Sequence, residues 1–509
     1  MEKIKKKFSF RMFSLVAFVS FVLILAGCAG ISGSESAEET KSLTAAYDTA
    51  IISLDPYGTA HGEPATILAA KQIFDTLVVK DGDEFKPSLA TEWEQPDPNT
   101  WVFTLRDDVT FHDGSNLTAE DVKASLEHLV TRAESPLTVL WEAFDSVEAT
   151  DEYTVTIKTT KPLGTMLSNL SLLFISPAEK LDEEEFFRNP IGSGPFQVES
   201  FQPEQELKLT GYKDYWNGAP NLDELTFLTI PETSSRLTAL ETGEIDLTWT
   251  VPNDQIEGLA NNEDIELIED DSYLYYFNWF NSSQEPFNDV RVRQALWYAL
   301  DIETIVEDLF GDTGEQQYAP IPSSVFGYSE QQPYEYNPEK ARELLEEAGY
   351  PDGFTARIIW AKGSGPQILE LQQTMAFYWS EIGVEIEPDQ LERAEWIEKL
   401  NNLDWDMDLQ TNSVITGDAD YTLGRLYVSE ANRNGYKNEE LDEILIAAKE
   451  TTDQAERKEL YAEANKIIWE EAVGIFPVQL KQVHAIRSHV KGFVPDPSGA
   501  PEFHQVTVE

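Results

Sequence analysis

Two hydrophobic periodicities alternate along most of the chain. Apolar residues recur at helical spacing in segments such as 65–79, 290–299 and 439–450, which predicts amphipathic helices. The aromatic run YLYYFNWFN, residues 273–281, is too apolar for an edge strand and predicts a strand buried inside a sheet. Strands that alternate with helices in this way indicate an α/β fold.

Local signals place several of these elements more closely. Thr118 and Asp121 form a variant of the capping box and predict the start of a helix. A second helix is predicted at 454–471, and two strands, 475–480 and 484–490, are predicted to follow it. No repeat of about 20 to 50 residues is visible, and the second half of the chain does not copy the first.

The amino terminus has the pattern of a secretory signal. Lysines and an arginine precede an apolar segment from Met12 to Ala26, about 15 residues, which is short of the roughly 20 that cross a bilayer as a helix. The chain's only cysteine, Cys28, follows in the sequence Leu-Ala-Gly-Cys, which resembles the lipobox of bacterial lipoproteins. The alternative is an uncleaved anchor with an incidental thiol.

This resemblance implies that a peptidase removes residues 1–27 after Cys28 has received a lipid. Residues 28–42 are small and polar and suit a flexible tether. We therefore expect the protein to be lipid-anchored at the extracellular face of the cell membrane.

Charge and composition exclude some classes of function. Asp and Glu total 92 against 37 Lys and Arg, a net charge of −55, which repels phosphates and argues against a nucleic-acid ligand. We interpret this charge as an adaptation to a salty or alkaline exterior. With 41% hydrophobic residues and a length beyond what one core usually organises, two or more lobes are expected.

Catalytic and metal-binding motifs are missing from the sequence. It contains none of the patterns HExxH, GxSxG, GxxxxGK[ST] and GxGxxG, and its six histidines never fall at metal-ligand spacing. The acidic stretch 403–410, LDWDMDLQ, lacks the glycine and the distal glutamate of a calcium-binding loop and is better explained as a strand. We expect no enzymatic activity, no metal and no cofactor.

Several blocks of the sequence resemble a known family. ATEWEQPDPNTWVFTLRDDVTFHDGSNLTAEDVKASLEHL, IGSGPFQV, PFNDVRVRQALWYALD and NPEKARELLEEAGYPDGF occur in the order found in family 5 extracellular solute-binding proteins. These are the receptors of dipeptide, oligopeptide, glutathione and nickel importers. The resemblance covers essentially the whole mature chain.

The resemblance implies a fold and a mechanism. The implied fold is a two-lobed α/β fold like that of periplasmic binding proteins, of type II and in the large peptide-binding class. It would have mixed sheets, and two crossing segments, YFNWFN and FPVQLKQ, would form its hinge. Lobe I would comprise residues 43–270 with 480–509 returning to it, and lobe II residues 271–479. Ligand would bind between the lobes of a monomer and stabilise a closed state, which the permease of an ABC importer, driven by its ATPase subunits, recognises.

The segment TGDADYTLGRLYVSE, residues 416–430, resembles the TGD or GEAD motif of dipeptide and glutathione receptors, whose acidic side chain meets the α-amino group of the ligand. A buried ammonium needs a carboxylate partner to offset its desolvation. By this match Asp418 is the first candidate and Asp420 the second. Tyr421 stands where glutathione receptors often carry Trp. The alternative is that these acidic residues lie on a solvated loop.

A peptide receptor also needs a cation for the carboxylate of its ligand. Dipeptide receptors use an arginine in the segment that corresponds to 360–366, where this chain has only Lys362. Arg425 is an alternative, because a guanidinium can bind a carboxylate through two parallel hydrogen bonds. Tyr57 and His61 lie in a loop that lines the cleft in the family and are further candidate contacts, although His61 could equally be an exposed loop residue.

A nickel chelate is the alternative ligand. Nickel receptors of this family often use a histidine of the later lobe, whereas no histidine occurs here between His128 and His484. Aromatic and arginine contacts alone can hold a chelate, so the alternative stays open. A peptide or a glutathione-like peptide is the first expectation.

Overall fold

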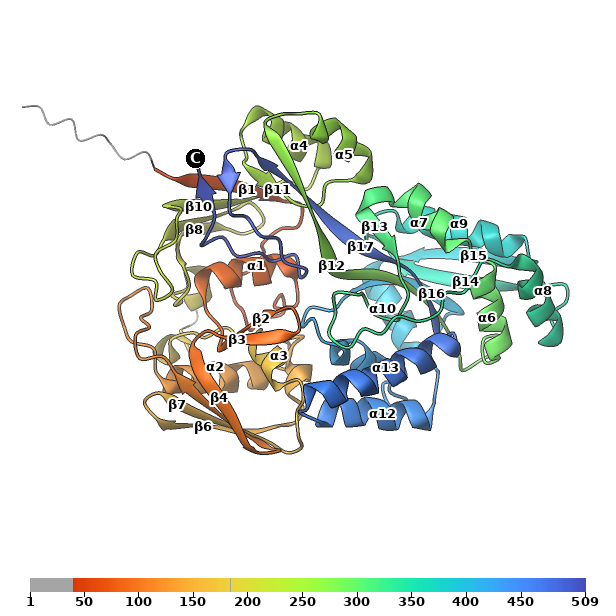
Figure 1. Cartoon of the computed structure of the whole chain (residues 1–509), viewed down its shortest axis with the longest axis horizontal. Helices are drawn as coiled ribbons and strands as arrows, with labels where there is room; N and C mark the ends of the chain where they lie inside the picture. The colour runs from red at the N-terminus through yellow and green to blue at the C-terminus, as the bar shows by residue number, and fades with distance from the viewer. Residues whose placement is uncertain (1–39, 184) are drawn as a thin grey trace, which may run out of the picture. The chain divides into compact units, whose positions relative to one another are not determined.

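Two long strands, β12 (Ile265–Phe280) and β17 (Gly474–Arg487), pair antiparallel and run through the middle of the structure (Figure 1). The structure is a computed structural model that describes residues 40–183 and 185–509. The prediction that the aromatic run is a buried strand is confirmed, since Tyr275 to Phe280 are buried. The prediction of two separate strands after residue 474 is wrong: one continuous strand, β17, spans both segments because it stays paired with β12 along nearly its whole length.

These two strands belong to a mixed sheet of eleven strands. On one side of the pair lie the three strands of the later half, and on the other side lie the strands of the earlier half. In spatial order the ten strands of the main path are β15 (Val384–Leu391), β14 (Phe354–Ala361), β16 (Met407–Ser413), β12, β17, β11 (Leu247–Thr248), β1 (Ser42–Tyr47), β10 (Glu224–Thr229), β9 (Glu206–Gly211) and β8 (Phe196–Gln202), and β13 (Gly314–Gln316) also pairs with β17.

Three smaller sheets complete the strand content of the described residues. They are a four-stranded sheet in the order β4 (Ala90–Asp97), β5 (Thr100–Leu105), β7 (Thr154–Thr159) and β6 (Phe144–Asp151), and the two-stranded pairs β2 (Val78–Asp81) with β3 (Glu84–Pro87) and β18 (Val490–Lys491) with β19 (Thr507–Val508).

Helices pack beside these sheets. In the described residues they are α1 (Pro64–Ile73), α2 (Ala119–Thr131), α3 (Met166–Leu170), α4 (Thr233–Thr242), α5 (Asn253–Ala260), α6 (Val290–Tyr298), α7 (Ile302–Leu309), α8 (Pro338–Glu347), α9 (Ile368–Ser380), α10 (Arg393–Asn402), α11 (Leu423–Leu426), α12 (Glu439–Glu450) and α13 (Gln454–Glu470). The capping box predicted for Thr118 and Asp121 is present at the start of α2. The helices predicted at 439–450 and 454–471 are confirmed as α12 and α13.

Helix α1 ends earlier than its apolar pattern predicts. The pattern continues to residue 79, but the helix stops at Ile73, and the carbonyl oxygen of Ile73 accepts a hydrogen bond from the backbone N–H of Gly194 at 2.9 Å. Asp75 then turns inward, where its carboxylate accepts hydrogen bonds from Tyr215 and Trp216. A tertiary contact from more than a hundred residues away therefore ends this helix.

The apolar interior is divided among several clusters. The largest is built from residues between Tyr273 and Leu480. Separate clusters are built from residues of the earlier half, and two of these also take residues from the segment after Val483. Each part of the chain thus buries its own apolar surface, which is the main stabilising contribution to such a fold.

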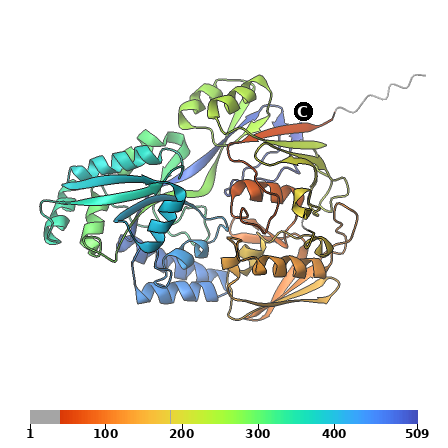
Figure 2. The same cartoon turned by 180° about the vertical axis from the view of Figure 1, so that it is seen from behind.

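One small cluster joins the earlier and later halves. Ile415, which follows β16, packs against Leu137 and Leu172, with Leu140 and Tyr421 at its edge. Nearby, the backbone N–H of Gly164 donates to the carbonyl oxygen of Lys449 at 2.8 Å, so α12 and α13 lie beside the segment that carries α3 in both views (Figures 1 and 2).

The predicted amino-terminal signal, the predicted tether up to residue 39 and Cys28 lie outside the described residues. Among the residues that the structure describes, no helix is both long and apolar enough to span a bilayer.

Candidate functional site

Asp418 lies at the centre of a buried charged cluster. Its carboxylate accepts two hydrogen bonds from the guanidinium of Arg457 on α13, at 2.8 and 2.9 Å, and a third from the hydroxyl of Ser168 on α3 at 3.1 Å. Both charged side chains are almost fully buried, with exposed fractions of 4% and 1%. Burial alone would lower the pKa of Arg457, but the charge and hydrogen bonds of Asp418, together with the charges of Tyr461 and Asp420, outweigh this effect and raise that pKa. Ser168, Asp418 and Arg457, here called the Asp418 cluster, satisfy one another.

Asp420, two residues further along, is bound much less completely. It lies in the 3-10 turn Ala419–Tyr421, and its backbone N–H donates to Asp418. Its carboxylate accepts a hydrogen bond from the hydroxyl of Tyr461 at 3.5 Å, which is long for such a bond. Burial raises the pKa of Asp420, and the charge of Lys449 partly offsets this effect. Asp420 is therefore a buried carboxylate without a close cationic partner in the described part of the chain.

A cavity of about 680 Å³, here called the large cavity, opens beside Asp420. Pockets of roughly 300–1,000 Å³ are typical of small-molecule sites. One wall comes from residues 139–163 and the other from residues 420–450. Apolar side chains line it together with three cations and five carboxylates, which are Lys161, Arg425 and Lys449, and Glu142, Asp420, Glu430, Asp442 and Glu450.

Ion pairs close the rim of the large cavity. Lys161 and Glu450 lie 3.0 Å apart, and Lys449 and Glu142 lie 3.7 Å apart. Each pair joins the two walls. The side chain of Lys161 is substantially exposed, and that of Lys449 is partly exposed. Exposed pairs contribute little stability, so they are weak contacts that can open and close.

Two of the other predicted residues line the large cavity. Tyr421 and Arg425 both lie on its wall, where the Arg425 guanidinium lies over the Tyr421 ring at 4.2 Å. The Nε–H of Arg425 donates to the carbonyl oxygen of Tyr421 at 2.8 Å. This stacked arrangement fixes the guanidinium, and among residues 40–183 and 185–509 its outer N–H groups have no hydrogen-bond partner.

Three of the predicted residues lie elsewhere and have partners within the protein. Tyr57 is fully buried, and its hydroxyl donates to the carbonyl oxygen of Phe174 at 2.6 Å. His61 is fully buried rather than exposed, lies 3.2 Å from the carbonyl oxygen of Leu172, and has a pKa lowered to about 4 by burial. Lys362 is exposed and pairs with Glu392. None of the three lines the large cavity.

Sequence reasoning missed Arg457, Ser168, Lys161 and Lys449. A signal for Arg457 was available: it lies at helical spacing from buried residues of α13, four residues before Tyr461. An arginine on the buried face of a helix needs a carboxylate partner. Ser168, Lys161 and Lys449 carry no such signal, because only the approach of two distant segments gives them a role.

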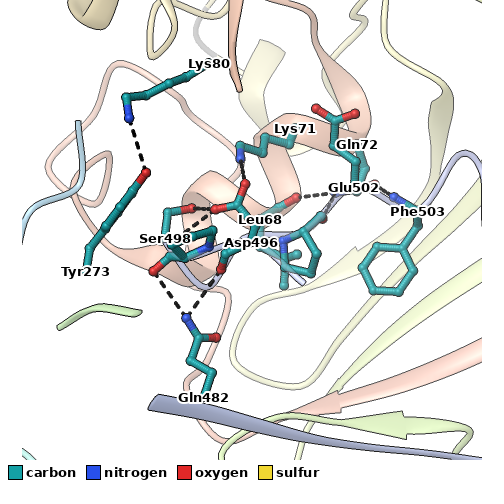
Figure 3. Close-up of polar contacts among 12 residues, drawn as sticks. Leu68, Lys71, Gln72, Lys80, Tyr273, Gln482, Asp496, Ser498, Glu502 and Phe503 are labelled. Atoms are coloured by element: carbon teal, nitrogen blue, oxygen red, sulfur yellow. Dashed lines mark hydrogen bonds and ion pairs between the residues drawn. The ribbon is translucent and has the colours of Figure 1, made fainter. Parts of the chain in front are cut away.

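A second polar cluster lies where the carboxyl-terminal segment meets β12 (Figure 3). Lys71 pairs with Asp496 at 2.9 Å, Gln482 donates to the backbone of residues 496 and 497, and the hydroxyl of Tyr273 lies 3.5 Å from Lys80. The charge of Lys71 is matched by Asp496 within this cluster, and we regard the cluster as structural.

Comparison with known proteins decides the family. Residues 84–434 match the model of bacterial extracellular solute-binding proteins, family 5 Middle. The chain belongs to this family. The resemblance seen in the sequence blocks is thereby confirmed, and the chain is a solute-binding protein of an ABC importer and not an enzyme.

Relatives within family 5 are similar along nearly their whole length. The glutathione-binding protein GsiB of Salmonella typhimurium is 31% identical over 477 residues, which cover 89% of this chain and 92% of that protein. The structure of HbpA2 from Haemophilus parasuis has a TM-score of 0.82 at 28% identity, and that of DppA from Helicobacter pylori in complex with the peptide STSA has a TM-score of 0.77 at 27% identity. Each covers 92% of this chain, with 100% and 98% of those chains covered. The predicted α/β periplasmic-binding-protein fold is confirmed.

Proposed function

We propose that this protein captures short peptides with a free amino terminus in the large cavity and delivers them to the permease of an ABC importer. The observation that carries the proposal is the pairing, on one cavity wall, of a buried carboxylate without a close cation, Asp420, with a fixed guanidinium, Arg425. A zwitterionic peptide supplies the two opposite charges that this wall lacks. The names of GsiB and of the DppA complex, which refer to glutathione and to a peptide, point to the same ligand class.

We assign the ligand's ammonium to Asp420 rather than to Asp418. A carboxylate that already accepts two hydrogen bonds from a buried guanidinium and one from a hydroxyl has little capacity left. Asp420 accepts one long hydrogen bond and faces the cavity. A ligand ammonium beside it would offset the cost of burying its charge. Asp418 then supports the site by holding the turn that carries Asp420.

Closure of two lobes is the mechanism we propose for signalling to the permease. Lobe I would be residues 43–270 with 480–509, and lobe II residues 271–479, joined by β12 and β17. The separate apolar clusters of the two parts support this division. The weak ion pairs Lys161–Glu450 and Lys449–Glu142 link the two parts at the cavity rim. A ligand shifts the balance only by as much as it prefers the closed state.

A lipid on Cys28 would hold the receptor at the extracellular face of the membrane. The support is the signal-like sequence before Cys28 and the polar tether after it. Radiolabelled palmitate fed to an expressing monoderm host should label the wild-type protein and leave Cys28→Ser unlabelled. Equal labelling of both proteins would contradict the anchor.

A thermal-shift screen tests the choice of ligand. The protein is heated with glutathione, with di- to pentapeptides, and with nickel in the presence and absence of histidine. A ligand at a hundred times its dissociation constant stabilises the folded state by about 2.7 kcal/mol. Peptides should raise the melting temperature of the wild type, and Asp420→Asn should abolish most of that shift. A shift with nickel and histidine alone would refute the peptide proposal and favour the nickel alternative.

A further inference from the structure

A second, smaller cavity lies behind Arg425. Its volume is about 170 Å³, and its wall includes the aromatic side chains Phe277 and Trp279 of β12, the amides Gln410 and Asn412 of β16, and two arginines, Arg425 and Arg433. We call it the arginine pocket. Because Arg425 lies on the wall of both cavities, the arginine pocket adjoins the large cavity.

The charge of the arginine pocket is opposite to that of the protein as a whole. The chain has a net charge of −55, yet no Asp or Glu among the residues that the structure describes lines this pocket. Within the described residues, neither Arg425 nor Arg433 takes part in an ion pair, whereas seven of the thirteen arginines there do. Two cations that face a shared space without an anion mark a place where an anion is missing.

Arg433 is the less satisfied of the two. One terminal N–H group donates to Asn401 at 3.2 Å, whereas its Nε is buried and has no hydrogen-bond partner in the described structure. Burial lowers the pKa of Arg433, and the charge of Arg425 lowers it further. A buried donor without a partner is costly, and a ligand oxygen would remove that cost.

The amides of the pocket are already used inside the protein. Asn412 donates from Nδ2 to the hydroxyl of Thr422 at 2.8 Å, and Gln410 donates to Asp408. Asp408 is buried behind Gln410 and also accepts from Trp396, and burial raises its pKa to about 7. The free donors of the pocket are therefore those of the two arginines.

We propose that the arginine pocket is a specificity subsite that binds a second carboxylate of the ligand, so that this receptor prefers acidic peptides. This inference rests on the proposed function, because the pocket is too small for a whole peptide and shares Arg425 with the wall of the large cavity. Its size suits one carboxylate group, which the guanidinium of Arg433 can bind, while Arg425 binds the terminal carboxylate from the shared wall. The matching ligand class is a peptide that carries an acidic side chain, or a γ-linked glutamyl residue, in addition to its terminal carboxylate.

Isothermal titration with matched peptides tests the inference. Di- to pentapeptides are used in pairs that differ only by Glu in place of Gln, so that one carboxylate is the only change. We expect the wild type to bind the Glu member at least about tenfold more tightly, as charge-assisted hydrogen bonds imply. Arg433→Gln should remove this preference and leave the affinity for the Gln member unchanged, and Arg433→Lys should restore part of it.

The control is Arg188→Gln, since the side chain of Arg188 is far more exposed, with an exposed fraction of 82%, and is not among the residues that line either cavity. The melting temperature of each variant shows that it folds. A wild type that binds both members equally, or a preference that Arg433→Gln leaves intact, overturns the inference while the proposed function stands. A wild type that binds no peptide of either kind overturns both.

Discussion

The Asp418 cluster and the arginine pocket treat charge in opposite ways. In the Asp418 cluster, Arg457 and Asp418 neutralise each other through two hydrogen bonds. In the arginine pocket, Arg425 and Arg433 face each other with no carboxylate on the wall. The first region is complete without a ligand, whereas the second and the neighbouring Asp420 are not. Compensated buried charge holds the fold, and uncompensated charge is available for binding.

The largest expected effect is a loss of protein stability when the Asp418 cluster is broken. Arg457→Met leaves the Asp418 carboxylate buried without its cation, and removal of one partner of a buried pair costs about 3–5 kcal/mol. Urea unfolding should show a loss of this size. The double variant Asp418→Asn/Arg457→Met should recover part of it, because no unpaired charge then remains. A loss below about 1 kcal/mol for Arg457→Met would mean that the pair is not a structural element.

The next largest effect is a loss of peptide affinity when Asp420 is changed. Asp420→Asn removes the carboxylate proposed to meet the ligand's ammonium. Truncation of one partner of a buried charge pair costs about 2 kcal/mol or more, which corresponds to a loss of affinity of roughly thirtyfold. Titration calorimetry measures this loss, and the urea midpoint should hardly change. The comparison fails if Asp420→Asn lowers the urea midpoint substantially while its peptide affinity is retained.

A smaller effect is expected where the two halves meet. A Cβ atom on Gly164 would overlap the carbonyl oxygen of Thr451 and approach the side chain of Arg457. Such overpacking costs about 1–3 kcal/mol and pushes the two proposed lobes apart at this contact, so Gly164→Ala should weaken peptide binding by about fivefold or more. Gly258→Ala is the matched control, because a Cβ there meets nothing within 4 Å. Equal peptide affinities of the two variants would show that this contact is not part of closure.

The smallest effect near neutral pH comes from protonation of Asp420. Burial raises its pKa, and only the ionised form pairs with an ammonium. Peptide affinity should therefore be full above that pKa and fall as the pH drops through it, by at most about tenfold per pH unit. The pH profile of Asp420→Asn should be flatter over this range. Parallel profiles for the two proteins would assign the pH dependence to another group.

Much of the fold could be predicted from the sequence. Periodicity and caps located α12, α13 and the start of α2, because these elements depend on local signals. The early end of α1 and the continuous strand β17 were not predictable in this way. A hydrogen bond from Gly194 ends α1, and pairing with β12 carries β17 through the polar residues Lys481 and Gln482. Both depend on partners distant in sequence.

The site was predictable only in part. Three residues of the predicted segment 416–430, which are Asp420, Tyr421 and Arg425, line one cavity. The motif alone led us to rank Asp418 before Asp420 as the partner of the ligand's ammonium. The motif cannot show that Arg457, 39 residues later, donates hydrogen bonds to the carboxylate of Asp418. Whether these residues bind the ligand stays a prediction. Tyr57 and His61 sit in the expected loop, but their side chains point into the protein interior.

One measurement tests the central claim most directly. A short peptide that binds the wild type is titrated in two forms, with its amino terminus free and with the same terminus acetylated. Acetylation removes the ammonium and changes little else, so the account predicts that affinity falls by roughly thirtyfold in the wild type and hardly at all in Asp420→Asn. Equal affinity of the wild type for the free and the acetylated peptide would contradict the claim that Asp420 receives the ligand's amino group.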